Sequence, residues 1–400
     1  SDGSIKTDPT TGKPYKRGQY AEWIMFAAQI PRDEYLKRAK EDFKAEKFDA
    51  KEWVRMAKEA GMKYIVITSK HHDGIALLNT PVGHTIFKDT DIRRDILKEL
   101  VNEARKAGLK IGFYYSQALD WNNPGGMGWI PQNDAPNREA SYADKAKYTD
   151  EIVIPHLHTI INDYKVDLIW WDMGASSAPE FKYRMMKAIK NIPGTERLIF
   201  NDRMEDKLTG DFKTPEQSIP DMPSNGDGTD WETCMTLNDN WGYAAHDIRW
   251  KTTEDVLQKL IDITSKGGNY LLNIGPKADG TFPAESINCL EEVGSWMKVN
   301  SEAIYGTIPS PFVSQLDWGR ATRKEVDGKQ FLYLHVFTQY WPKDGKLLVP
   351  DFGSGIKRAY LLIDAKKTSL PIDKMGDNHI FSLPLDAPDK ISTTIVVETL

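Results

Sequence analysis

The sequence has only two cysteines, Cys234 and Cys289, in 400 residues. Two cysteines do not make a disulfide framework, and neither belongs to a Cys-x-x-Cys pair, so a thiolate zinc site is not expected. No run of the chain approaches the roughly 18 consecutive apolar residues of a membrane span, which predicts no transmembrane helix. The first twenty residues are polar and lack the apolar segment of a signal peptide.

The chain also lacks an excess of basic residues. Lysine and arginine total 52 against 58 aspartates and glutamates, which gives a net charge of −6. This balance argues against a nucleic-acid partner, because such proteins normally carry a basic surface. Hydrophobic residues make up 40% of the chain and charged residues 28%, as in a folded globular protein of one large domain with an appendage. Twelve tryptophans stand out, and they serve either as sugar-stacking platforms or as core filling.

Strands alternate with amphipathic helices along the first 300 residues. A helix is predicted from Asp49, whose spacing to Glu52 is typical of a capping box, to Gly61. The apolar run at 64–67 follows at once and is expected to be a strand buried on both faces. Further helix and strand pairs are predicted at 95–108 with 109–115, 142–164 with 166–171, 179–192 with 198–201, and 253–266 with 269–274.

This alternation predicts an α/β fold with parallel strands, and its length fits a (β/α)8-like barrel over residues 1–306. The pattern then changes to short strands without helices between them. An antiparallel β-sandwich is therefore expected over residues 307–400. Its strands are predicted at 331–337, 347–350, 359–363, 379–383 and 393–397.

In such barrels the chemistry lies just beyond the carboxyl ends of the strands. Reading only those positions gives histidines, carboxylates and tryptophans in the segments 69–74, 114–121, 169–174, 200–203 and 212–216. Convergence of these side chains on one rim is typical of a glycoside hydrolase, which needs two carboxyl groups beside the bond that it cleaves.

Seven motifs occur here in an order that resembles the α-L-fucosidases of glycoside hydrolase family 29. They are KHHDG (70–74), FYYSxxxDW (113–121), WWDMG (170–174), NDR (201–203), DFKTPEQ (211–217), DWETCMTLNDNWGY (230–243) and GGNYLLNIGPKADGTFP (267–283). The resemblance covers residues from about 20 to 310. It implies a retaining, exo-acting hydrolase of terminal α-L-fucosyl residues on oligosaccharides or glycoconjugates. It also implies that no cofactor is needed, and a periplasmic or secreted location.

By this resemblance, Asp172 matches the catalytic nucleophile and Trp170 a tryptophan that contacts the sugar. The residues agree with these roles, because Asp172 ends an apolar strand where a carboxylate is held rigidly. Alternation along a strand places Trp170 on the same side as Asp172 and Trp171 on the opposite side. A plain loop aspartate that caps the following turn is the alternative.

His71 and His72 match paired histidines that bind the hydroxyl groups of fucose, Tyr114 an active-site tyrosine and Arg203 an arginine near the sugar. A zinc site formed by His71, His72 and Asp73 is the alternative, but adjacent residues at a strand end point in opposite directions. The histidines could also be structural, and Tyr114 and Arg203 could be core or helix partners.

The general acid/base is assigned to Glu216, because DFKTPEQ resembles the segment where one subfamily carries it. Glu232, in DWETC, is the alternative acid/base. The true residue should be partly desolvated, since a proton donor at neutral pH needs a raised pKa. Tyr20, Glu22 and Trp23 resemble a Tyr-x-Glu-Trp segment that lines the sugar subsite.

The sequence differs from the family pattern at the first strand of the barrel. The family carries a Phe-Gly-x-Phe-x-His-Trp-Gly motif there, and nothing like it precedes Gln19. We expect this strand to belong to the natural protein and to be missing from the sequence.

Two alternatives to the fucosidase remain: an exo-glycosidase for a fucose-like sugar such as a galactoside, and a glycan-binding protein without catalysis. The oligomeric state is not predicted.

Overall fold

The computed structural model describes residues 21–28, 30–126, 140–221, 229–312 and 314–400. The chain divides into two compact units. The first unit comprises Ser1–Thr214, Thr236–Trp250 and Asn273–Ile287, and the second comprises Pro215–Met235, Lys251–Leu272 and Asn288–Leu400. The sequence-based domain boundary between residues 306 and 307 stays a prediction.

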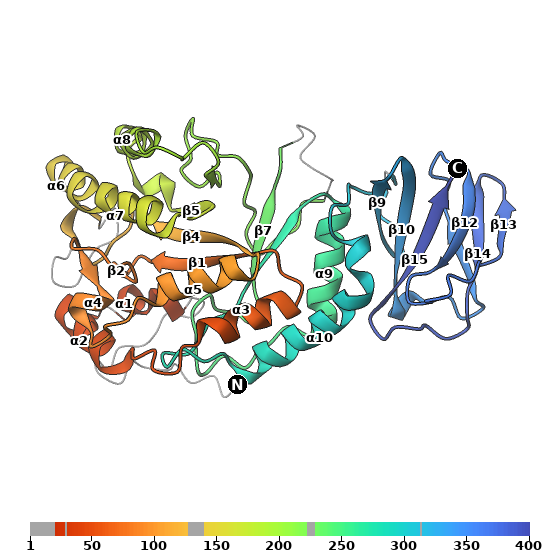
Figure 1. The fold of residues 1–400 in the computed structure, drawn as a ribbon, viewed down its shortest axis with the longest axis horizontal. Helices are drawn as coiled ribbons and strands as arrows, with labels where there is room; N and C mark the ends of the chain where they lie inside the picture. Colours follow the sequence, from red (N-terminus) through yellow and green to blue (C-terminus); the bar gives the residue numbers. More distant parts are fainter. Residues whose placement is uncertain (1–20, 29, 127–139, 222–228, 313) are drawn as a thin grey trace. The chain divides into compact units, whose positions relative to one another are not determined.

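The first unit is built on a sheet of four strands that are all parallel to their neighbours. In spatial order they are β1 (Tyr64–Lys70), β4 (Lys110–Ser116), β5 (Leu168–Asp172) and β6 (Ile199–Phe200). Figure 1 shows β1, β4 and β5 side by side, with helices α3 and α5 beside them. Parallel strands joined through helices confirm the predicted α/β class. They also bring the carboxyl ends of these strands to one edge of the sheet.

The helices of the first unit include those predicted there from the sequence. They are α1 (Ile24–Ala27), α2 (Arg32–Asp42), α3 (Ala50–Glu59), α4 (Ile86–Asp89), α5 (Ile96–Lys106), α6 (Tyr142–Tyr148), α7 (Ile154–Thr159) and α8 (Pro179–Lys190), with the short strands β2 (Ile75–Ala76) and β3 (His84–Thr85) after β1. Helices α1, α2 and α4 were not predicted. Asp49 caps α3 as predicted, accepting hydrogen bonds from the backbone of Lys51 and Glu52. The expected capping box is not completed, because the Glu52 carboxylate pairs with Arg55. Within the described residues, no helix is both long and apolar enough to cross a membrane.

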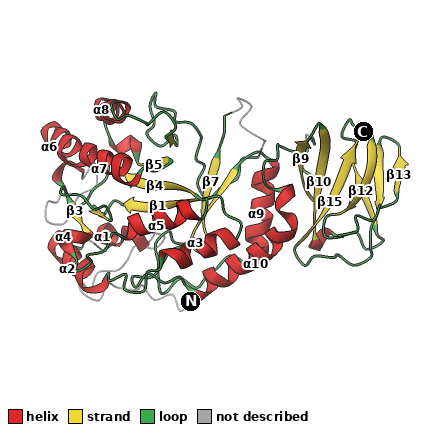
Figure 2. Cartoon of the chain, in the orientation of Figure 1, coloured by secondary structure: helices red, strands yellow, loops and turns green. Residues whose placement is uncertain are grey.

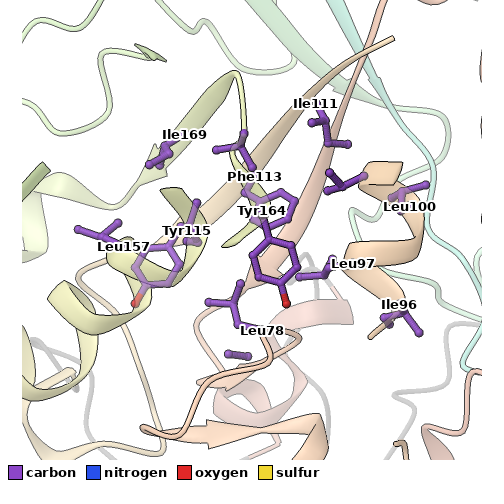
Figure 3. Packing of buried hydrophobic residues seen from close by; sticks show 14 of the residues in the cluster. Leu78, Ile96, Leu97, Leu100, Ile111, Phe113, Tyr115, Leu157, Tyr164 and Ile169 are labelled. Carbon is purple, nitrogen blue, oxygen red and sulfur yellow. The ribbon is translucent and has the colours of Figure 1, made fainter. Parts of the chain in front are cut away.

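The hydrophobic core of the first unit lies between the sheet and its helices (Figure 3). Every second residue of β4 points into it, as alternation along a strand requires. Ile111, Phe113 and Tyr115 are fully buried there, against Leu97 and Leu100 of α5. The alternate residues of β4 and β5 face the other side of the sheet, where the candidate site residues lie.

The prediction that the strand at 64–67 is buried on both faces is wrong. These four residues are only partly buried, and Thr68 is exposed. The reason is that β1 is the edge strand of the sheet in the described part of the chain. A strand with one neighbour leaves more of its surface accessible than a central strand such as β4.

A buried histidine joins α7 to β4. The ring of His156 places Nε2 at 3.2 Å from the carbonyl oxygen of Val82 and Nδ1 at 2.9 Å from the hydroxyl of Tyr115. A carbonyl oxygen only accepts, so Nε2 carries the proton and Nδ1 accepts from Tyr115. Burial lowers the pKa of His156 to about 4, so the ring is neutral at physiological pH.

We therefore expect the first unit to lose stability as the pH falls from about 6.5 to about 4. In this range an unfolded His156 binds a proton while the folded residue stays neutral, so the unfolded state takes up more protons and is favoured. Urea unfolding at several pH values measures the effect. The variant His156→Gln, which cannot titrate, should depend less on pH than the wild type. An equal dependence in both proteins would contradict this expectation.

The second unit contains most of the remaining strands and helices. They are β7 (Glu232–Thr236), α9 (Thr253–Ser265), β8 (Asn269–Asn273) and α10 (Ala284–Asn300), followed by the strands of the C-terminal part. β7 and β8 are hydrogen-bonded neighbours. α9 and β8 confirm the helix and strand predicted at 253–266 and 269–274.

The C-terminal strands form two antiparallel sheets, drawn in yellow in Figure 2. One sheet has the order β12-β15-β10-β9 and the other β11-β14-β13. The strands are β9 (Gly319–Val326), β10 (Lys329–Phe337), β11 (Lys346–Val349), β12 (Ile356–Leu361), β13 (Ile372–Met375), β14 (Asn378–Ser382) and β15 (Ser392–Thr399). Five of these strands match the sequence-based prediction, whereas β9 and β13 were not predicted.

Candidate active site

Asp172 is the last residue of β5, and two side chains hold its carboxylate. The hydroxyl of Tyr114 donates to Oδ2 at 2.7 Å, and the guanidinium of Arg203 donates to Oδ1 at 3.1 Å. The backbone N–H of Asp172 donates to the side-chain oxygen of Gln117 at 3.0 Å. The Asp172 side chain is 14% exposed, so solvent reaches a carboxylate whose orientation is fixed. A nucleophile in a double displacement needs such a carboxylate.

The two tryptophans before Asp172 point to opposite faces of β5, as predicted. Trp171 is fully buried in the core and stacks on Phe200, with 6.0 Å between ring centroids. Trp170 lies on the face of Asp172, where its ring stacks on Tyr114 at 5.7 Å. The guanidinium of Arg203 lies 4.5 Å from the centroid of the Trp170 ring. Trp170 therefore supports both donors that hold the carboxylate.

Tyr114 acts as a permanent hydrogen-bond donor at this site. Burial raises the pKa of its phenol well above the usual range, and the negative charge and hydrogen bond of Asp172 raise it further. The hydroxyl therefore stays protonated at physiological pH. Its register opposite Trp170 in the β4–β5 pair places it beside the end of β5.

His71 and His72 follow β1 and lie next to Asp172. The Nε2 atom of His72 is 3.7 Å from Oδ2 of Asp172, a separation too long for a hydrogen bond. The His71 ring stacks on Tyr114, with 5.5 Å between centroids and 15° between planes. In the described part of the chain, the buried Nδ1 atom of His71 has no hydrogen-bond partner, as expected of a group that binds a ligand.

Both histidines are neutral at physiological pH. Burial lowers the pKa of His71 to about 4, an effect that the Asp172 charge partly offsets. Burial likewise lowers the pKa of His72 well below its usual range. Among the residues that the structure describes, no group of three or more histidines, cysteines, aspartates and glutamates is arranged to hold a metal ion. Neutral imidazoles suit hydrogen bonding to uncharged sugar hydroxyls.

Glu22 and Trp23 belong to the same unit and lie near these residues. The Trp23 ring meets His72 edge-on at 5.1 Å and Trp121 at 5.3 Å. The carboxylate of Glu22 accepts a hydrogen bond from the backbone of Gly242 at 2.9 Å. Gly242 is part of the motif at 230–243, so this motif contributes to the arrangement around Trp23. Tyr20, the third residue of the predicted segment, lies outside the described residues.

Glu216 and Glu232, the two acid/base candidates, both belong to the second unit. Glu216 forms a parallel bridge with Cys234 of β7, the strand that begins at Glu232. Side chains alternate along a strand, so Glu232 and Cys234 share one face, and bridge partners such as Glu216 face the same side. Glu216 is exposed, whereas Glu232 is only 3% exposed. The two glutamates are therefore neighbours in different environments.

Three supporting residues of this site received no individual role from the sequence, although they lie within the motif at 113–121. Ser116, the last residue of β4, contacts His72, and Gln117, the next residue, contacts the backbone of Asp172. Trp121 is fully buried against Trp23 and His72. The signal that locates them is their position at or just past the end of β4. Their roles depend on contacts between segments far apart in the chain.

Comparison with known proteins gives a consistent result. The profile of the alpha-L-fucosidase family matches residues 10–302. The alpha-L-fucosidase of Dictyostelium discoideum is 29% identical over 94% of this chain and 85% of its own length. The plasma alpha-L-fucosidase of Pongo abelii is 31% identical over 77% of this chain and 65% of its own length. The chain thus spans slightly less than two thirds of that mammalian relative.

Solved structures agree with the sequence relatives. Alpha-L-fucosidase isoenzyme 1 from Paenibacillus thiaminolyticus is 29% identical, with a TM-score of 0.82 over 95% of this chain and 93% of its own. The alpha-L-fucosidase from Vibrio sp. strain EJY3 is 30% identical, with a TM-score of 0.86 over 97% of this chain and 68% of its own. These similarities confirm the predicted fold class, a (β/α)8-like barrel followed by a C-terminal antiparallel β-sandwich. The chain belongs to the alpha-L-fucosidase family of glycoside hydrolases.

Proposed function

We propose that this chain is a retaining, exo-acting alpha-L-fucosidase that hydrolyses terminal α-L-fucosyl residues of oligosaccharides or glycoconjugates. The observation that carries the proposal is the Asp172 carboxylate, fixed by Tyr114 and Arg203 beside the neutral His71 and His72. A structural relative supports it: a GH29 alpha-L-fucosidase from Bacteroides thetaiotaomicron, 28% identical with a TM-score of 0.82, was trapped as a covalent intermediate with 2-fluoro-fucosyl fluoride.

The reaction proceeds by double displacement. Asp172 attacks the anomeric carbon, and the bond to the leaving oxygen breaks as the acid/base protonates that oxygen. The same acid/base then removes a proton from water, which attacks the glycosyl ester and releases the sugar with its original configuration. Tyr114 and Arg203 hold the attacking carboxylate in one orientation, and His71 and His72 bind sugar hydroxyls.

Glu216 is the proposed acid/base, supported by the resemblance of its segment DFKTPEQ to that of the family. Glu232 is the alternative, supported by its burial, because the acid/base is expected to be partly desolvated. Glu216 is exposed and Glu232 is buried, and the kinetics of variants at each position distinguish their roles.

A panel of aryl glycosides tests the substrate class. The proposal predicts turnover of aryl α-L-fucosides and little or no turnover of aryl galactosides. Preference for a galactoside would favour the alternative exo-glycosidase, and binding of fucose without any turnover would favour a glycan-binding protein. Proton NMR of the first-formed sugar is expected to show the α anomer, since two inversions restore the configuration. A first-formed β anomer would contradict the retaining mechanism.

The cellular compartment is part of the same proposal. A periplasmic or secreted location fits an enzyme that removes terminal sugars from glycans outside the cytoplasm. Fractionation of the native source, with immunodetection of the protein, tests this location. Recovery in the cytoplasmic fraction alone would contradict it.

A further inference from the structure

The hydroxyl of Ser116 determines which nitrogen of His72 carries a proton. Ser116 Oγ lies 2.9 Å from the carbonyl oxygen of Leu119 and 2.7 Å from Nδ1 of His72. A carbonyl oxygen cannot donate, so the single hydroxyl proton of Ser116 lies on the bond to Leu119. Ser116 must then accept from His72, and the proton on this ring is at Nδ1.

The second nitrogen of His72 is thereby left with a lone pair. Nε2 lies 3.7 Å from Asp172 Oδ2, beyond hydrogen-bond distance, and that oxygen already accepts from Tyr114 at 2.7 Å. His72 is 1% exposed, so little of its ring is open to solvent. An acceptor beside the proposed nucleophile suits a sugar hydroxyl that donates its hydrogen.

Lys70 contacts the same carbonyl oxygen as Ser116. Its ammonium is fully buried, donates to the carbonyl oxygen of Leu119 at 3.1 Å and lies 3.4 Å from the Asp120 carboxylate. It also lies 5.2 Å from the centroid of the Tyr115 ring. Lys70 and Ser116 thus share one acceptor, which ties the ends of β1 and β4 to the loop after β4.

The charge of Lys70 acts against a proton on the second nitrogen of His72. The charged and titratable groups around this ring include Lys70, His71 and Asp73 on its own segment, Asp120 after β4 and Asp172 on β5. After burial, the proximity of His71 and the positive charge of Lys70 both lower the pKa of His72. An imidazolium, which has no lone pair to offer, is disfavoured at this position.

We propose that Ser116 and Lys70 are positioning residues that keep His72 neutral, with its proton on Nδ1 and its Nε2 lone pair ready to accept a hydrogen bond from a sugar hydroxyl. The binding of a sugar hydroxyl to Nε2 of His72 rests on the proposed fucosidase function. The state of the ring does not, because it is set by contacts within the protein.

The test begins with the wild-type protein labelled with ¹⁵N in its eight histidines. The His72 signals are identified by their loss in His72→Gln. At neutral pH without substrate, Nδ1 should show a directly bonded proton, and Nε2 should have the chemical shift of an unprotonated ring nitrogen. A proton on Nε2, or on both nitrogens, would overturn the proposal whether or not the chain hydrolyses fucosides.

Ser116→Ala then tests the role of the hydroxyl. Without its acceptor, Nδ1 loses the preference for the proton, so the signal of the other tautomer should appear. The KM for an aryl fucoside should rise about tenfold, equivalent to about 1.4 kcal/mol, with a smaller change in kcat. Ser69→Ala is the matched control, because Ser69 is also fully buried and donates to a backbone carbonyl, that of Tyr114. An unchanged tautomer in Ser116→Ala, or an equal tautomer change in Ser69→Ala, would overturn the assignment.

The double variant Lys70→Met with Asp120→Asn tests the role of the charge. Removing both charges leaves the local net charge unchanged, and the buried Asp73 carboxyl, which also interacts with Lys70, keeps its hydrogen bond from Tyr35. The side-chain oxygen of asparagine can still accept from the backbone of Asn122 and Asn123, as Oδ1 of Asp120 does. The pKa of His72 should rise. The decrease of kcat/KM at low pH should therefore begin at a pH closer to neutral. A folded double variant with an unchanged pH dependence would overturn the role of Lys70, and the measurements on His72 and Ser116 stand without it.

Discussion

Replacing Asp172 with alanine is expected to lower kcat/KM for an aryl α-L-fucoside by on the order of 10³-fold or more, because it removes the carboxylate that forms the covalent intermediate. The fold should persist, because the lost side chain is partly exposed and lies at the end of a strand. Steady-state kinetics and circular dichroism measure both effects. Asp163→Ala, on an exposed aspartate remote from the site, is the control and should retain activity.

Added azide should partly restore turnover by Asp172→Ala, because a small anion can occupy the space of the missing carboxylate. Azide should leave the wild type unaffected. Turnover close to that of the wild type in Asp172→Ala, without azide, would contradict the role of this residue.

Loss of the acid/base should have the second large effect, and its size should depend on the leaving group. A phenol of low pKa departs largely without protonation, whereas a sugar alcohol needs the proton. Glu216→Ala should therefore retain the first step on dinitrophenyl fucoside, with a burst of released phenol. Hydrolysis of a natural fucosyl-oligosaccharide should fall by about 10²-fold or more. Stopped-flow absorbance and product analysis measure these two effects.

Glu232→Ala is the matched comparison, because Glu232 lies on the same face of the neighbouring strand. It should show at most a uniform loss without leaving-group dependence. With Glu216→Ala, azide should accelerate the second step and give β-L-fucosyl azide by inverting the configuration of the intermediate. If Glu232→Ala gives this product and Glu216→Ala does not, the two roles are exchanged, as the burial of Glu232 favours. If neither gives it, Glu22 is the next carboxylate to test.

Much of the first unit follows from local sequence patterns. The strands, the helix cap at Asp49 and the opposite directions of Trp170 and Trp171 depend on residues close together in the chain. Periodicity and capping report such features directly. The convergence of Asp172 with Tyr114 was also predictable, because both follow from strand ends at one edge of a parallel sheet.

Other features depend on distant contacts that local patterns do not contain. The partial burial of β1 follows from its place at the edge of the described sheet. The tautomer of His72 follows from Ser116 and Leu119, which lie on a different loop.

One omission had a local signal. The hairpin between β9 and β10 turns at Asp327 and Gly328, which have φ values of 51° and 73°. Asp-Gly is a preferred pair for such a turn, so the dipeptide itself predicts β9 when read with its flanking residues. Charged side chains interrupt the apolar pattern of β9, so periodicity alone does not predict this strand.

The most direct test of the central claim is to trap the covalent intermediate on this protein. The wild type is incubated with 2-deoxy-2-fluoro-L-fucosyl fluoride, digested and analysed by peptide mass spectrometry. We expect one equivalent of fluorofucosyl label on the peptide containing Asp172, and no label on Asp172→Ala. A label on another carboxylate, or inactivation of the wild type without any label, would contradict the assignment of Asp172 as the nucleophile of a retaining fucosidase.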